Sequence, residues 1–151
     1  MSVRDVAEYI LRSRGEMTAM KLQKLVYYAQ AWSLVWDERP LFEEKIQAWA
    51  NGPVCRTLYG YHRQQFIVQA NMFKIGDLDL DEKARGTIEA VLNFYNEKSA
   101  QWLSDLTHLE EPWRKARARA GVADGAPSEE EITLADMHEY YSGLQASNSA
   151  N

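Results

Sequence analysis

Cysteine and histidine are the residues of this sequence best suited to nucleophilic or metal chemistry, and the chain has one cysteine and three histidines. Cys55 and His62 lie seven residues apart on one predicted helix, which places both on roughly the same face. A cysteine nucleophile usually takes its histidine partner from a different segment and needs a stabilised thiolate. We therefore interpret the pair as a small buried thiol beside a surface histidine.

His108 and three acidic pairs are the remaining candidates for metal binding or acid–base catalysis. His108 falls near a predicted helix end, where it can interact with the terminal carbonyl groups, and no second ligand stands at a useful spacing. Adjacent acids are typical of solvated helix starts and faces, an interpretation that covers Glu43–Glu44, Asp79–Asp81 and Glu110–Glu111. The sequence lacks a glycine-rich phosphate loop and the HExxH and GxSxG motifs. It therefore predicts a protein that is not an enzyme, with no metal site and no cofactor.

Length and charge limit the class of protein further. A chain of 151 residues fits one domain that can bury a core, and its single cysteine excludes an internal disulfide. The formal net charge of -5 disfavours nucleic-acid binding, because phosphate contacts depend on lysine and arginine. A local basic run fits the last turns of one helix and comprises Arg114, Lys115, Arg117 and Arg119. No stretch resembles a signal peptide or a membrane span, so we expect a cytoplasmic protein without a membrane partner.

Apolar residues at helical spacing predict a mostly α fold around one central helix. Thr18 can cap this helix, which is predicted to run to about Trp36 and is apolar on most of its circumference. Its predicted polar strip consists of Lys21, Gln23, Lys24 and Gln30. A helix of this kind is buried among others, so we expect the rest of the compact fold to pack around it.

Capping and turn signals predict the ends of the other helices. The predicted starts are Ser2 with Asp5, Pro53, Asp79 with Glu82, Ser99, Pro112, and either Ser128 with Glu131 or Thr133 with Asp136. Gly15 and Gly121 are predicted helix ends. One or two short strands are expected, at residues 45–48 and 66–68. We expect a single domain over residues 1–144 and a disordered tail over residues 145–151, because the tail is small and polar.

Three stretches form a combination that is specific in order and spacing, although each alone would be weak. They are Lys21–Gln30, Ile46–Val54, and Leu106–His108 followed by Glu111–Trp113. Together they resemble the Panacea-domain family, which includes phage-associated proteins and the antitoxins of toxin–antitoxin pairs. The resemblance extends over nearly the whole chain, from about Val3 to Tyr141.

The resemblance implies a bacterial protein that acts by binding other proteins. Panacea-domain antitoxins neutralise a toxin encoded beside them, typically by direct protein–protein contact. At least one relative also acts as an adaptor that delivers its toxin to a protease. We therefore expect an antitoxin, and the alternatives are a proteolytic adaptor or a phage-associated regulatory binding protein. Some members carry an N-terminal DNA-binding segment, for which this chain has no room, so autoregulation through such a segment is not expected.

Most residues of the shared motifs are predicted to be structural, because they resemble core and turn positions. This structural set is Lys21, Leu22, Gln23, Lys24, Leu25, Tyr27, Gly52, Pro53, Val54, Thr107, His108, Pro112 and Trp113. Interface hot spots favour tryptophan, tyrosine and arginine. On that basis the candidates for toxin contact are Tyr28, Trp49, Arg56, Tyr59, His62 and Arg63.

Overall fold

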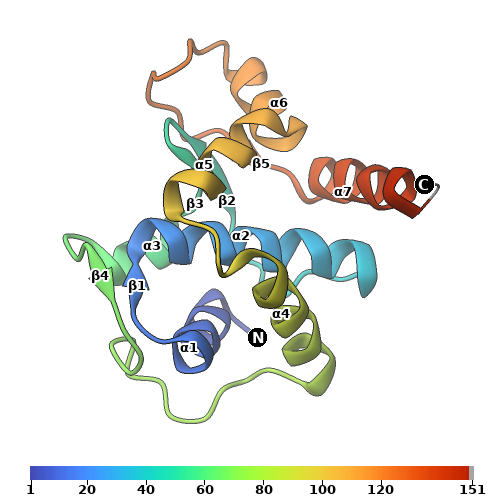
Figure 1. Cartoon of the computed structure of the whole chain (residues 1–151). Helices are drawn as coiled ribbons and strands as arrows, with labels where there is room; N and C mark the ends of the chain where they lie inside the picture. Colours follow the sequence, from blue (N-terminus) through green and yellow to red (C-terminus); the bar gives the residue numbers. More distant parts are fainter. Residues whose placement is uncertain (150–151) are drawn as a thin grey trace.

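The computed structural model describes residues 1–149, which form seven helices and five short strands (Figure 1). The helices are α1 (Val3–Arg14), α2 (Ala19–Trp36), α3 (Arg56–His62), α4 (Glu82–Tyr95), α5 (Ala100–Leu109), α6 (Glu111–Ala120) and α7 (Leu134–Ser149). The prediction of a mostly α fold is confirmed.

The strands form two small antiparallel sheets. β1 (Met17–Thr18) pairs with β4 (Ile67–Val68). The other sheet has the order β3-β2-β5 and is built from β2 (Ile46–Trp49), β3 (Gly52–Cys55) and β5 (Glu131–Ile132). The expected strands near residues 46 and 67 are confirmed, whereas the local signals did not predict β1, β3 and β5.

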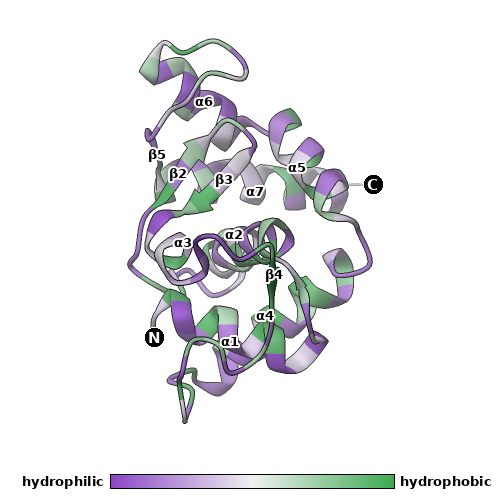
Figure 2. Ribbon diagram, turned by 90° about the vertical axis from the view of Figure 1, so that its left-hand side faces the viewer, coloured by the Kyte–Doolittle hydropathy of each residue, from purple (hydrophilic) through white to green (hydrophobic). Residues whose placement is uncertain are grey.

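Helix α2 is the middle layer of the molecule. Figure 2 shows the β2–β3 hairpin, α5 and α6 on one side of α2, with α1 and α4 on the other side. Every side chain from Leu22 to Leu34 is buried. The prediction of a central buried helix is therefore confirmed, and its burial on all sides follows from its apolar circumference.

The predicted polar strip of α2 is wrong at Gln23, Lys24 and Gln30, all of which are buried. Gln30 Nε2 donates to the Phe42 carbonyl at 2.8 Å, and the Leu41 N–H donates to Gln30 Oε1 at 2.7 Å. Buried backbone groups need partners, and these side chains provide them for the segments that cross α2. Polar residues on a central helix therefore hold neighbouring backbone and do not face solvent.

Pro53 lies in β3 and not at the start of a helix, so that prediction is wrong. In the antiparallel register Pro53 is opposite Ala48. The Ala48 N–H donates to the Glu130 carbonyl, and the Ala48 carbonyl accepts from Arg117 Nη1, so both groups point away from Pro53. Pro53 therefore belongs to a non-hydrogen-bonded pair on an edge strand, where its missing N–H costs nothing.

Most predicted helix caps are confirmed, but the cap of α4 is displaced. The side chain of Asp81, and not Asp79, accepts from the first turn of α4, through the Ala84 N–H at 2.8 Å. Asp79 is held by α1 instead, because its N–H donates to Asp5 Oδ1 at 3.2 Å. Helix α6 also begins one residue before Pro112. The confirmed side-chain caps are Ser2 with Asp5, Thr18, Ser99 and Thr133.

Helix α7 continues to Ser149, so the predicted disorder is wrong for residues 145–149, and residues 150–151 lie outside the described part of the chain. Two contacts explain the continuation. Leu144 packs against the core, and Trp36 Nε1 of α2 donates to Gln145 Oε1 at 2.6 Å. The small polar residues of this segment extend an existing helix. Extension costs less than starting a helix, and contacts with α2 already fix the preceding turns of α7.

Candidate protein-binding cleft

A cleft of about 700 Å³ lies beside the N-terminal turns of α2 and the β2–β3 hairpin. We call it the hairpin cleft. Its walls come from Ala19, Met20, Gln23, Lys24, Trp49–Asn51, Val54, Tyr59, His62, Gln64–Phe66 and Pro127–Glu129. It therefore brings together three of the predicted contact residues, Trp49, Tyr59 and His62.

Three aromatic side chains, Trp49, Tyr59 and Phe66, lie in the walls of the hairpin cleft. The rings of Trp49 and Tyr59 meet edge to face, with centroids 5.0 Å apart. Phe66 is 77% exposed, and Met20 on α2 is 38% exposed. Large apolar side chains left in solvent around a cleft are typical of surfaces that contact other proteins.

His62 lies in the wall of the hairpin cleft and is buried, so the prediction of a surface histidine is wrong. Its Nε2 lies 2.9 Å from the amide nitrogen of Gln23, which identifies that ring nitrogen as the acceptor of a neutral imidazole. Burial lowers the pKa of His62, which also favours the neutral ring. Local spacing alone could not reveal this burial, because Gln23 comes from a different helix.

Cys55 is buried, as predicted, and is not an activated nucleophile. Burial raises the pKa of its thiol to about 11, so the thiol stays protonated at neutral pH. The Cys55 N–H donates to Gln23 Oε1 at 2.9 Å, and its carbonyl accepts from Gln23 Nε2. The buried, protonated thiol of Cys55 therefore agrees with the interpretation of Cys55 and His62 as a non-catalytic pair.

Lys24 reaches the hairpin cleft from α2 although its side chain is almost fully buried. Its Nζ donates to the Pro53 carbonyl at 3.1 Å. Burial lowers the pKa of Lys24 to about 7. Gly52 makes this placement possible, because a Cβ at that position would lie 2.6 Å from Lys24 Cε and 3.1 Å from Thr107 Oγ1.

The three motif stretches meet behind the hairpin cleft. The β2–β3 turn is held from α6 by Trp113, whose Nε1 donates to the Trp49 carbonyl at 2.8 Å. The His108 ring lies against Trp113, with centroids 4.1 Å apart, and burial lowers the pKa of His108. Lys24 and Thr107 also lie close to Gly52. These neighbours are far apart in sequence, and the fold brings them together in one junction.

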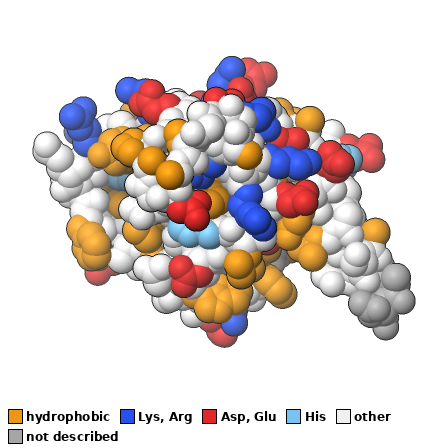
Figure 3. Space-filling model, turned by 90° about the horizontal axis from the view of Figure 1, so that it is seen from above, with side chains coloured by type: hydrophobic (Ala, Val, Ile, Leu, Met, Phe, Trp, Pro, Cys, Tyr) orange, Lys and Arg blue, Asp and Glu red, His pale blue; other side chains and the backbone are white. Residues whose placement is uncertain are grey.

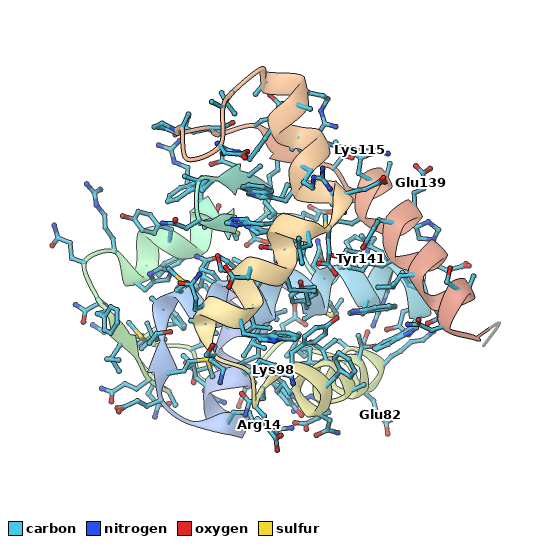
Figure 4. All side chains as sticks on the ribbon, turned by 45° about the horizontal axis from the view of Figure 1, so that its top comes forward. Arg14, Glu82, Lys98, Lys115, Glu139 and Tyr141 are labelled. Carbon is cyan, nitrogen blue, oxygen red and sulfur yellow. The ribbon has the colours of Figure 1, made fainter. Side chains whose placement is uncertain are left out.

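Tyr28 lies in the core, so its choice as a toxin-contact residue is wrong for the folded chain. Its hydroxyl donates to Glu110 Oε1 at 2.7 Å, and Tyr141 donates to the same oxygen at 2.8 Å. Figure 4 shows Tyr141 lying between α7 and α5 above α2. The prediction that Glu110 is a solvated helix start is therefore wrong. Glu110 is a buried carboxyl, and burial raises its pKa.

Charged residues line the rim of the cleft without forming a basic patch. Arg56 Nη1 donates to Glu129 Oε1 at 2.8 Å, and both side chains are exposed. Arg63 is exposed next to the lining segment. In the predicted basic run, Arg117 is buried against Trp113 and Arg119 pairs with acids. Figure 3 shows acidic and basic side chains interleaved on the face seen from above the view of Figure 1.

Comparison with known protein families gave one match. The family described as antitoxin SocA-like, Panacea domain, matches residues 22–114. No curated protein and no solved structure matched the chain. The matched segment begins in α2, includes the β2–β3 hairpin and ends in α6, so it contains the whole junction of the three motifs. Separately, none of the helices within residues 1–149 has both the length and the hydropathy needed to cross a bilayer.

Proposed function

The chain belongs to the SocA-like antitoxin Panacea-domain family, and we propose that it is an antitoxin that neutralises a cognate toxin by direct binding. Family membership carries this proposal, because it covers the central helix and the hairpin that frame the cleft. The proposed partner is a protein encoded by the adjacent gene. The proposed mechanism contains no catalytic step, since neutralisation needs only a stable contact.

The hairpin cleft is the surface we assign to the toxin. The Trp49 and Tyr59 rings already pack against each other in the fold, so they lose little side-chain entropy on binding, and Phe66 adds an exposed ring beside them. Arg56 and Arg63 supply exposed cations beside this area. An aromatic centre with a charged rim is the usual arrangement of an interface hot spot.

Co-expression with the product of the adjacent gene tests the proposal. We expect the neighbour to arrest growth alone, and this protein to restore growth and to co-purify with the neighbour as a stable complex. Restored growth without a complex would contradict direct neutralisation. A neighbour that is not toxic would favour a phage-associated regulatory role instead.

A proteolytic adaptor is the second candidate, because the molecule has a second apolar surface. A groove of about 700 Å³ between α2, α4, α5 and α7 is lined by Trp36, Phe94, Trp102 and Leu109, all of which are at least 41% exposed. An adaptor must hold a toxin and a protease at once, and two separate surfaces meet that requirement. Pulse-chase of the toxin discriminates the two functions: an inhibitor leaves its half-life unchanged, whereas an adaptor shortens it.

A further inference from the structure

Lys24 is a buried amine in the hairpin cleft that has no carboxylate partner among the described residues. Its side chain is 1% exposed, and the Pro53 carbonyl is the acceptor of its one hydrogen bond within residues 1–149. A protonated lysine has three N–H donors. The nine ion pairs formed by the described residues do not include Lys24. A buried cation normally has a charged partner, so this amine is an exception that calls for an explanation.

The surroundings of Lys24 favour a negative charge. Glu129 is the one acid among the lining residues, and it is engaged at the rim by Arg56. Arg117 is buried behind the hairpin, where its Nη1 donates to the Ala48 carbonyl, so a second cation lies on the core side of the hairpin. The first turn of α2 also lines the cleft and contains no acid, which leaves the positive end of that helix dipole uncompensated.

We propose that Lys24 anchors a carboxylate from an acidic segment of the partner protein, whose apolar neighbours pack on Trp49, Tyr59 and Phe66. This assignment rests on the proposed function and specifies the chemistry of its partner. A polyanion such as nucleic acid fits less well, because the chain has a formal net charge of -5 and the cleft offers one lysine between aromatic walls. One ammonium group matches one carboxylate.

The proposal has a pH signature that follows from linkage. The carboxylate binds the protonated amine, and the pKa of free Lys24 is about 7. Peptide carboxyl groups are ionised above about pH 5. Affinity should therefore fall about tenfold between pH 6 and pH 8, as the amine of the free protein loses its proton. The comparison stays above pH 6 because the His62 ring also lines the cleft and has a pKa lowered by burial.

A selection of random displayed peptides against the purified full chain supplies the probe without a known toxin. We expect enriched peptides to share an aspartate or glutamate flanked by apolar residues. Synthetic versions should lose at least tenfold in affinity when the acid is replaced by its amide, and when the protein carries Lys24→Met. Lys83→Met, a substitution at an exposed lysine outside the cleft, should bind as the wild type does. Thermal melting followed by circular dichroism checks that each variant is folded.

Any one of the following results would overturn the assignment. These are enriched peptides without acids, equal binding by Lys24→Met, and an affinity of the wild type for the acidic peptide that is the same at pH 6 and pH 8. Displacement of the peptide by a short oligonucleotide would also overturn it, since the site would then be a general anion site. The pH measurement needs no variant, so a misfolded Lys24→Met does not leave the question open. Failure of growth rescue with successful peptide binding would refute only the antitoxin function, and the reverse result would refute only this site.

Discussion

At the residue scale, the junction at Gly52 is the tightest point described near the cleft. Gly52 has a φ of +122°, which L side chains rarely adopt, and an added Cβ would lie 2.6 Å from Lys24 Cε. Two independent requirements, backbone conformation and space, therefore select glycine at this turn. The glycine and the buried lysine depend on each other, because the lysine chain occupies the space that a side chain at Gly52 would need.

We predict that Gly52→Ala destabilises the protein by about 2 kcal/mol or more, from backbone strain and overpacking combined. Urea unfolding followed by circular dichroism measures the change. Gly60→Ala is the matched control, because Gly60 lies in α3 with no atom within 4 Å of an added Cβ. This control should be neutral or stabilising by up to about 1 kcal/mol. Equal losses for the two variants would refute the account of Gly52.

Lys24 should also make stability depend on pH. Its pKa is about 7 in the folded chain, against about 10.4 unfolded, so between these values the unfolded state binds more protons. Stability from this group therefore rises with pH, by up to about 2–3 kcal/mol between pH 7 and pH 9. Lys24→Met removes the titration. We expect the unfolding free energy of Lys24→Met minus that of the wild type to decrease by that amount from pH 7 to pH 9. A difference that stays constant with pH would refute the prediction.

At the scale of the elements, a buried hydroxyl and carboxyl network joins α7 to the rest of the fold. Tyr141 of α7 donates to Glu110, which connects α5 to α6, and its hydroxyl lies 3.0 Å from that of Tyr27 on α2. The Glu110 carboxyl also accepts from Tyr28. Three elements thus meet at one buried oxygen, and loss of a donor leaves that oxygen short of a partner.

We predict that Tyr141→Phe lowers the free energy of unfolding by about 1–3 kcal/mol, because it removes one of two donors to a buried carboxyl. Tyr140→Phe is the control on the same helix, since the Tyr140 hydroxyl makes no hydrogen bond within residues 1–149. That control should change stability by less than about 0.5 kcal/mol. Chemical denaturation of both variants measures the difference, and similar values would show that the network contributes little.

At the scale of the whole molecule, the two proposed functions are assigned to two apolar surfaces: toxin binding to the hairpin cleft and protease binding to the second groove. The hairpin cleft is lined by Phe66, which is 77% exposed, and the second groove by Phe94, which is 67% exposed. Neither exposed ring is needed to fill the core. The two phenylalanines therefore form a matched pair for testing which surface holds the toxin.

We predict that Phe66→Asp abolishes growth rescue and co-purification with the toxin, because a charge in the hairpin cleft opposes burial of its aromatic walls. Phe94→Asp should retain both. If the chain is an adaptor, Phe94→Asp should keep the complex but lengthen the toxin half-life in pulse-chase. Loss of the complex with Phe94→Asp alone would move the toxin to the second groove.

Features that depend on nearby residues could be predicted from the amino-acid sequence. Side-chain caps at Ser2, Thr18, Ser99 and Thr133 act within one helical turn, so they mark helix starts wherever the helix later packs. The apolar circumference of α2 predicted its burial in the same local way. The combination of three motifs also identified the family, which the match to residues 22–114 confirms.

Features that depend on distant partners could not be predicted locally, because those partners meet only in the folded chain. Gln23, His62 and Lys24 are polar residues on helices, and their burial is possible because backbone and side chains from other segments accept or donate their hydrogen bonds. Pro53 occupies a strand because Ala48 directs its hydrogen bonds elsewhere. The hairpin cleft exists where α2, the hairpin and α3 meet, and no local pattern encodes a surface that distant segments form together.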